Sequence, residues 1–160
     1  MSDHDSLLRR LSLEEARLQL SHFDATLAWD LASSLRERAL AQGLAIAFDV
    51  SFAGITWAYV SMEGASPDNA EWIRRKKNVV LRYQKSSYAV LTEMEKRGAT
   101  LESRGCPIAD YVAAGGCFPL RMRGASGVLG TLTVSGLSGR EDHELAVSVL
   151  AERLGVELST

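Results

Sequence analysis

The stretch LAIAFDVSFAGITWAYV, from Leu44 to Val60, carries the clearest structural signal in the chain. Apolar residues alternate with small or polar ones over Leu44–Phe52 and again over Ile55–Val60, the period-two pattern of strands that bury one face. Ala53-Gly54 between the two runs fits a tight turn. The stretch therefore predicts an antiparallel β-hairpin with one face in the core.

A second hairpin is predicted nearer the C-terminus. FPLRMR (Phe118–Arg123) and VLGTLTV (Val128–Val134) are joined by GASG, which has typical turn residues. RLQLSHF (Arg17–Phe23) alternates more weakly and fits either an edge strand or a short helix. The two hairpins together predict a central antiparallel sheet.

Four segments combine a helical apolar pattern with helix-boundary residues. They are residues 25–43 after the N-cap candidate Asp24, residues 66–83 beginning with Ser66-Pro67, residues 86–98, and residues 135–155 with a capping-box pattern at Ser138 and Glu141. PIADYVAAGG, residues 107–116, fits a helical turn closed by two glycines. With helices around an antiparallel sheet, the fold class is α+β, a sandwich.

The beginning of the chain is polar. Residues 1–11 are expected to be a flexible segment, and Ser12 with Glu15 fits a capping box for a short helical turn. Residues 12–160 are expected to form a single domain, because the length suits one core.

Composition excludes several classes of protein. The net charge is −2 and charged residues make up 24% of the chain, so a nucleic-acid-binding protein is not expected. No apolar run approaches the roughly 18 residues of a membrane span, and no apolar segment of a signal peptide follows Met1. We therefore expect a cytoplasmic protein with no membrane partner, whose Cys106 and Cys117 are reduced.

Four cations in a row, Arg74-Arg75-Lys76-Lys77, lie in the second helical segment. At about 100° per residue, most of them fall on or beside the polar face, which predicts a solvated helix face. Lys76 instead falls within the apolar arc, on one line with Asn69. A lysine there snorkels, pairs with a carboxylate or faces a cavity, because an unpaired buried charge costs several kcal/mol.

Asp142 is placed in the same way in the last helical segment, within the apolar stripe and in the first turn, where the helix dipole favours an anion. Lys76 and Asp142 are therefore predicted to pair. The pair either fastens two helices or lines a pocket, and the sequence leaves both open.

Other candidate groups have plain structural interpretations. His143 follows Asp142 in a first turn, where it fits an acid/base group or a haem ligand, but we expect a surface histidine. With His4 and His22 it forms no metal-binding spacing, so no metal site is predicted. Cys117 is expected to be a small buried thiol and not a nucleophile. The tryptophans Trp29, Trp57 and Trp72 are interpreted mainly as core residues.

Several motifs resemble one family. GGCFPLRMRG (115–124) followed by GVLGTLTVSGLSGREDHELA (127–146) resembles the C-terminal signature of the haem-degrading-domain superfamily, the GlcG/HbpS-like proteins. EWIRRKKNVVL (71–81) resembles the lysine-bearing helix of that superfamily, with Lys76 at the lysine position. The run PDNxxWIRRKxNVV is similar to an uncharacterised branch, and the resemblance covers residues 23–150.

The resemblance implies a profilin-like or PAS-like sandwich and a homo-oligomer. Some members of the superfamily bind haem or cobalamin-like ligands, others are encoded beside glycolate metabolism genes, and one eukaryotic relative is linked to delivery of tail-anchored proteins. Haem is a candidate cofactor through the resemblance only. The sequence has Asp142-His143 where the superfamily has two carboxylates, and no position matches a haem-ligating residue.

Three functional classes follow. The first is a protein that binds a small ligand, haem or a related anionic compound; the second is a non-catalytic oligomeric scaffold or adaptor; the third is an enzyme acting on a small metabolite, for which no catalytic residue is assigned. For the first class we expect a concave site with glycine N–H groups, an apolar wall, and a charged pair that orients an anion. Its predicted residues are Asn69, Trp72, Lys76, Gly115, Gly116, Phe118, Asp142 and His143.

Overall fold

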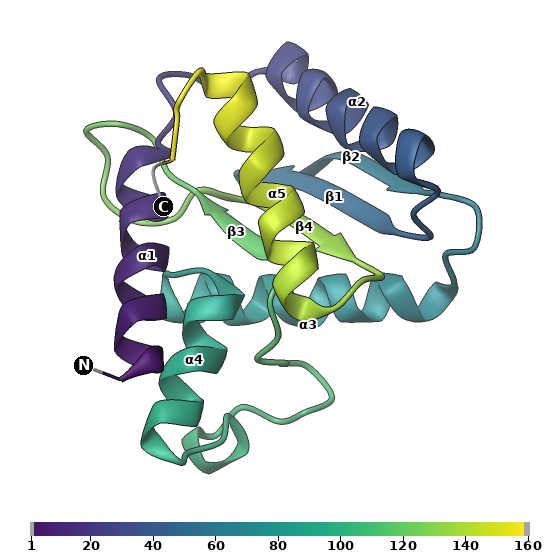
Figure 1. The fold of residues 1–160 in the computed structure, drawn as a ribbon. Coiled ribbons are helices and arrows are strands. Elements are labelled where there is room, and N and C mark those ends of the chain that lie inside the picture. The colour runs from purple at the N-terminus through teal and green to yellow at the C-terminus, as the bar shows by residue number, and fades with distance from the viewer. Residues whose placement is uncertain (1, 159–160) are drawn as a thin grey trace.

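The computed structural model of the protein describes residues 2–158. Its centre is an antiparallel sheet with the strand order β2-β1-β4-β3 (Figure 1). The strands are β1 (Ala47–Phe52), β2 (Ile55–Ser61), β3 (Cys117–Leu120) and β4 (Gly130–Ser135). Both predicted hairpins are present, and the predicted α+β fold with a central antiparallel sheet is confirmed.

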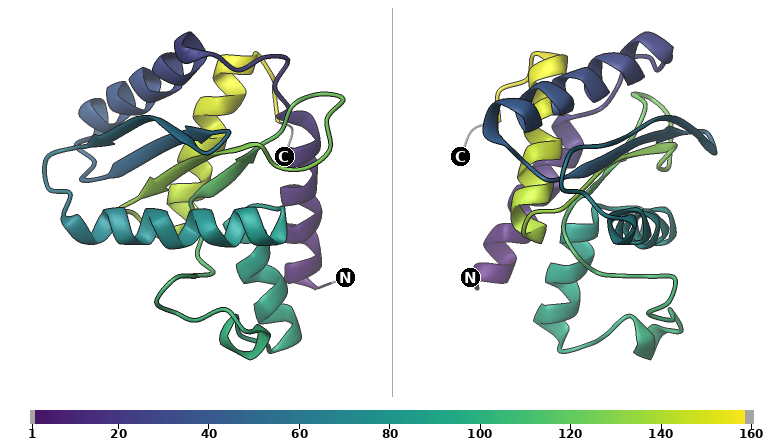
Figure 2. Two further views of the ribbon diagram at one scale, coloured as in Figure 1. Left: turned by 180° about the vertical axis from the view of Figure 1, so that it is seen from behind. Right: turned by 90° about the vertical axis from the view of Figure 1, so that its right-hand side faces the viewer.

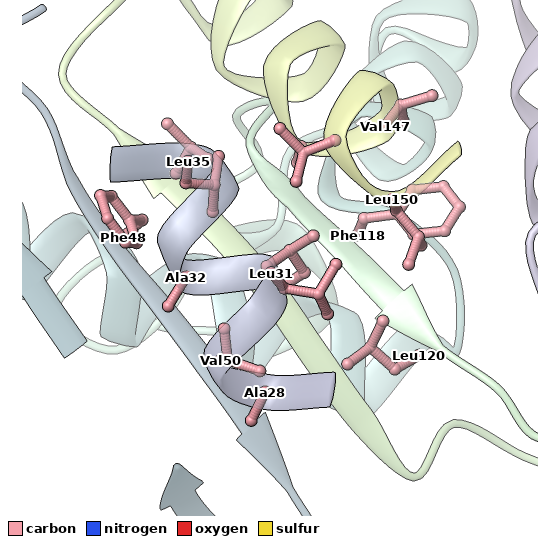
Figure 3. Packing of buried hydrophobic residues seen from close by; sticks show 14 of the residues in the cluster. Ala28, Leu31, Ala32, Leu35, Phe48, Val50, Phe118, Leu120, Val147 and Leu150 are labelled. Atoms are coloured by element: carbon pink, nitrogen blue, oxygen red, sulfur yellow. The ribbon is translucent and has the colours of Figure 1, made fainter. Parts of the chain in front are cut away.

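One face of the sheet is covered by α2 (Ala25–Gln42) and α5 (Gly139–Leu154), as Figures 1 and 2 show. Alternate residues of the strands point into this layer, among them Phe48 and Val50 of β1 (Figure 3). Leu31 and Leu35 of α2 meet them from the helix side. This layer is the main hydrophobic core, which accounts for the period-two pattern of the hairpin.

The other face of the sheet packs against α3 (Pro67–Tyr83). Here the intervening strand residues are polar and buried, including Asp49, Ser51 and Thr133. Lys77 of α3 lies 3.3 Å from Asp49 and donates to the Ser51 hydroxyl at 3.0 Å. The layer between α3 and the sheet is therefore held by polar contacts as well as by apolar ones.

The N-terminal segment differs from expectation. Asp3–Arg17 forms a helix, α1, where a flexible segment and a turn beginning at Ser12 were expected. Its cap is Ser2, whose side chain accepts a hydrogen bond from the Asp5 N–H while Asp5 accepts in return. The Ser12–Glu15 capping box is therefore wrong, because both residues lie inside the helix. Leu11 is buried and anchors the segment.

α1 packs beside α4 (Ser87–Arg97), so two helices from distant parts of the chain lie side by side (Figure 1). The weak Arg17–Phe23 pattern yields neither a strand nor a helix of its own; only Leu20 makes an isolated bridge, to Met122. In residues 107–116 the expected helical turn is confined to the start, where the Asp110 and Tyr111 N–H groups both donate to the Pro107 carbonyl at 3.0 Å, and it ends well before the two glycines. A short 3-10 helix occupies Glu102–Arg104.

The expected burial of the tryptophans is wrong for two of the three. Trp29 is 70% exposed and Trp57 is 41% exposed, while Trp72 is half-buried. Amphipathic periodicity places apolar residues on a face of an element, but it does not say whether this chain or another molecule covers that face. Within residues 2–158, no helix combines the length and the apolar character that crossing a membrane requires.

Candidate functional site

Lys76 and Asp142 meet as the sequence predicts. The Lys76 Nζ lies 3.1 Å from Asp142 Oδ2 and donates a second hydrogen bond to the Val134 carbonyl at 3.0 Å. Only 3% of the Lys76 side chain and 2% of the Asp142 side chain are exposed. The pair joins α3, on one face of the sheet, to the first turn of α5, on the other.

The second Asp142 oxygen also has a partner. Asp142 Oδ1 accepts the backbone N–H of Leu137 at 2.9 Å, just before α5 begins. Burial raises the pKa of this carboxyl, and this effect outweighs the opposing influence of the Lys76 charge and of the Leu137 and Gly136 amides. Asp142 therefore takes up a proton more readily than an exposed aspartate does.

The glycine pair packs directly against these groups. Gly116 has φ +135°, and a Cβ there would lie 2.6 Å from Lys76 Nζ and 2.4 Å from the Val134 oxygen. A Cβ on Gly115 would lie 2.2 Å from the Gly139 carbonyl oxygen at the start of α5. Only glycine allows the chain entering β3 to come this close, so the pair has a steric role beside Lys76.

A pocket of about 310 Å³ opens beside the pair. Four predicted residues line it: Asn69, Trp72, Lys76 and Asp142. Residues that the sequence reasoning did not identify complete the lining: Asp68, Ala114, Ser135, Gly136, Leu137 and Gly139. Lys76 and Asp142 are buried, so they form its floor.

The side chains at the mouth of the pocket are held by α3 itself. The Trp72 indole N–H donates to Asp68 at 3.1 Å, and the Arg75 guanidinium lies 4.7 Å from the centre of the Trp72 ring. Asn69 donates to the Ser135 hydroxyl at 3.2 Å and accepts the Ser66 N–H at 2.9 Å. Asn69 thus both caps α3 and connects it to the end of β4.

Two predicted residues lie elsewhere. Phe118 points into the main core, on the face covered by α2 and α5. His143 is buried and not at the surface or the rim of the pocket; its Nε2 lies 2.7 Å from Glu14 of α1. Neighbouring residues of a helix point about 100° apart, so Asp142 faces α3 while His143 faces α1. The sequence reasoning missed this pair because it missed α1.

The cysteines are structural. Both are buried, and burial raises the pKa of the Cys117 thiol to about 12, although the Thr133 hydroxyl donates to its sulfur at 3.2 Å. A thiol with that pKa is almost entirely protonated at neutral pH and is a poor nucleophile. In the described part of the chain, no cluster of three His, Cys, Asp or Glu side chains could hold a metal ion.

Comparison with known proteins agrees with this architecture. The chain is 48% identical over 149 residues to a UPF0303 protein of Burkholderia thailandensis, which covers 92% of this chain and 90% of that protein. The crystal structure of the Ybr137w protein superposes with a TM-score of 0.84 at 29% identity, covering 92% of this chain and 87% of that one.

A more distant structural neighbour is the crystal structure of a PduOC:heme complex. It has a TM-score of 0.66 at 22% identity and covers 89% of this chain and 99% of that one, a likeness of fold. A family model for the haem degrading protein HbpS-like family matches residues 23–151. The resemblance identified from the sequence motifs is thus confirmed: this chain belongs to the HbpS-like family, in its UPF0303 branch.

Proposed function

We propose that this protein binds a small organic anion in the pocket whose floor is formed by Lys76 and Asp142. The observation that carries the proposal is the buried ammonium. A lysine has three protons to donate, and within residues 2–158 two of them have acceptors, the Val134 carbonyl and the Asp142 carboxylate. The third is available to a carboxylate or phosphate oxygen that enters the pocket.

The start of α5 favours the same class of ligand. Gly139, the first residue of this 16-residue helix, lines the pocket. The N-terminus of a helix carries unpaired N–H groups and a partial positive charge, which attract anions. Asn69 adds an amide for a directional hydrogen bond, and the Trp72 ring provides an apolar wall. These groups suit a compact ligand with one acidic group.

Asp142 competes with such a ligand for Lys76. Because burial raises the pKa of Asp142, its protonation would relieve the repulsion when an anion arrives. Binding of the anion is therefore coupled to proton uptake, and the affinity rises as the pH falls.

Haem is the ligand that family membership and the PduOC:heme neighbour support. The residues of this pocket do not fit an iron porphyrin. Its volume is at the lower end of the roughly 300–1,000 Å³ of ligand pockets. His143, the nearest histidine in sequence, is paired with Glu14 and does not line it. We therefore place a compact carboxylate or phosphate ester here, and treat haem as a separate question for experiment.

The test is a thermal-shift series with small mono- and dicarboxylates and phosphate esters, alongside haemin titration followed by the Soret band. We expect saturable stabilisation by at least one compound, lost in Lys76→Met. Lys77→Met is the matched control: it also removes a cation from a buried carboxylate, Asp49, but does not line the pocket. Stabilisation that survives in Lys76→Met contradicts the proposal.

Two other outcomes would point to a different function. Haemin binding that is unaffected by Lys76→Met would support a haem site elsewhere and leave this pocket without a role. The absence of any response to anions or haemin would favour a scaffold whose Lys76–Asp142 pair only fastens two helices.

A further inference from the structure

A second hollow, larger than the Lys76 pocket, lies between α1 and α5. Its volume is about 710 Å³, in the middle of the roughly 300–1,000 Å³ range of small-molecule pockets. The C-terminal part of α2 reaches its edge, and the segment after α5 runs back beside α1 to form a further side (Figure 1). The lining residues of α5, from Glu144 to Glu152, span about 12 Å along the helix. The hollow therefore suits an elongated molecule.

Part of the lining is apolar and is left open by this chain. Val147 and Ala151 of α5 are four residues apart, so they lie on one side of the helix. Val156 and Leu158, in the segment after the helix, line the same hollow. Leu13 of α1 lines it as well and is 56% exposed. An aliphatic chain that covers Leu13 therefore removes apolar surface from water on the protein and on the ligand.

The acidic side chains of the lining already have partners of their own. Glu14 Oε1 lies 2.7 Å from His143 Nε2. Glu144 accepts a hydrogen bond at 2.9 Å from the arginine four residues before it, and Glu152 accepts one from Arg38. Within residues 2–158, the hollow thus has no unpaired carboxylate to offer to a cationic ligand.

The cations that α1 contributes are less engaged. Arg17 is exposed, and its guanidinium makes no ion pair or hydrogen bond with the rest of residues 2–158. The contact between Arg10 Nε and Glu14 Oε2 is long, 3.9 Å, and the other oxygen of Glu14 is closer to His143. The two arginines are seven residues apart, about two turns, so they project from the same side of α1. The hollow therefore has spare positive charge beside its apolar wall.

We propose that this hollow binds an aliphatic carboxylate with an extended chain. The chain lies against Leu13, Val147 and Ala151, and the carboxylate contacts the Arg17 guanidinium at the rim. The proposal goes beyond the function proposed for the Lys76 pocket, since the two sites share no residue. It also concerns a different class of ligand, because the compact anions placed beside Lys76 have no chain to fill this hollow.

The first test is isothermal titration calorimetry with hexanoate, octanoate and decanoate below their micellar concentrations. We expect saturable one-site binding whose Kd falls about tenfold for each two added CH₂ groups, because each CH₂ is removed from water. Decanoate should bind more tightly than 1-decanol, and decylammonium should bind most weakly. A Kd that does not change with chain length, or decylammonium binding as tight as that of decanoate, would overturn the proposal.

The second test locates the site with Leu13→Glu. Leu13 is more than half exposed and glutamate is a good helix former, so the variant keeps its fold, which far-UV circular dichroism checks. It removes apolar wall and places a like charge beside the carboxylate, so decanoate binding should weaken at least tenfold. Leu81→Glu, the same change at a 49% exposed leucine of α3, is the matched control and should bind as the wild type does. Equal binding by Leu13→Glu and Leu81→Glu would show that the chain lies elsewhere.

Two further variants separate the head group from the other pocket. Arg17→Gln should weaken decanoate binding by up to about fivefold, the upper range of an exposed ion pair, and leave 1-decanol binding unchanged. Lys76→Met should bind decanoate as the wild type does, whether or not compact anions bind beside Lys76. Loss of decanoate binding in Lys76→Met but not in Leu13→Glu would place the ligand in the Lys76 pocket and overturn this proposal.

Discussion

The Lys76 ammonium lies 3.1 Å from the Asp142 carboxylate, although the two residues are 66 positions apart and come from helices on opposite faces of the sheet. Lys76 also donates to the last part of β4 through the Val134 carbonyl. One buried charge pair thus connects α3, β4 and α5. A buried pair of this kind is expensive to form but much more expensive to break on one side.

Lys76→Met is therefore expected to lower the free energy of unfolding by about 3–5 kcal/mol, because it leaves Asp142 buried without its cation. Urea denaturation at pH 7 measures the change. Lys76→Met combined with Asp142→Leu should recover most of the loss, since the double variant leaves no unpaired charge. A loss in Lys76→Met below about 1 kcal/mol, the range of an exposed ion pair, would show that the pair is not buried in solution.

This pair was predictable from sequence because each member stood alone on an apolar helix face. Lys76 lies one turn from Trp72 and Val80, and Asp142 begins the stripe that continues through Ala146 and Val149. The hairpins were predictable for a related reason, since strict alternation over Leu44–Val60 allows little else. Elements with a strong apolar periodicity and clear boundary residues were predicted at the correct positions.

The missed features lack such a local signal. α1 is mostly polar, with Leu11 as its one buried apolar residue, so its apolar pattern is too sparse to predict a helix. Its cap, Ser2 with Asp5, does not have the usual glutamate. Because α1 was not predicted, its Glu14 could not be identified as the partner of His143, and the histidine was expected at the surface. The expectation for Trp29 failed for a different reason, because sequence periodicity cannot separate a face that this chain buries from a face that it leaves exposed.

A second prediction concerns Glu15 of α1. Burial raises the pKa of Glu15, and this outweighs the Ser86 amide and the charges of Arg121 and Lys85. A raised pKa in the folded state means that the contribution of Glu15 to stability is present below its usual value of 4.5 and is lost as the pH rises through the folded pKa.

Glu15→Gln has no such loss. Its stability relative to the wild type should therefore increase from pH 4 to pH 7, in urea unfolding series recorded at both values. Glu93→Gln, which removes a more exposed carboxylate beside Lys85, is the control. A difference between Glu15→Gln and the wild type that does not change with pH would contradict the burial effect.

The third prediction is that Cys117 is unreactive. Its thiol is fully buried and its pKa is about 12, so the fraction of thiolate at pH 8 is far below that of an exposed cysteine. Iodoacetamide labelling followed by peptide mass spectrometry should modify Cys117 in denaturant and leave it unmodified in the native protein. Rapid native labelling would revive Cys117 as a candidate nucleophile.

The fourth prediction is that the basic run does not bind nucleic acid. Arg74 pairs with Glu71 and Asp110, while Lys77 pairs with Asp49, so both cations have acidic neighbours. Arg75 also donates to the Ile108 carbonyl, and so this helix face holds the loop before β3.

With these charges neutralised, few are left to contact phosphates. Titration of single- and double-stranded DNA and of RNA at low salt, followed by fluorescence anisotropy, should give no saturable binding. Binding whose logarithm falls with the logarithm of salt concentration by several units would contradict the prediction.

The last prediction compares two glycines that both have positive φ. Gly43 ends α2 at φ +64°, and a Cβ there would meet no atom within 4 Å, so Gly43→Ala is expected to cost about 1 kcal/mol for the left-handed backbone alone. Gly116 has φ +135°, and its Cβ would collide with the Val134 oxygen and with Lys76 Nζ. Backbone in that region is essentially restricted to glycine, and it adds strain of about 1–3 kcal/mol before any collision.

Gly116→Ala should therefore cost at least twice as much as Gly43→Ala in urea unfolding. Because the added methyl group displaces the Lys76 ammonium from the floor of the pocket, it should also abolish the ligand-induced thermal shift that Gly43→Ala retains. Equal losses in the two variants would mean that the chain entering β3 moves away from Lys76 without cost. In that case the close contact between Gly116 and Lys76 would not be what shapes the pocket.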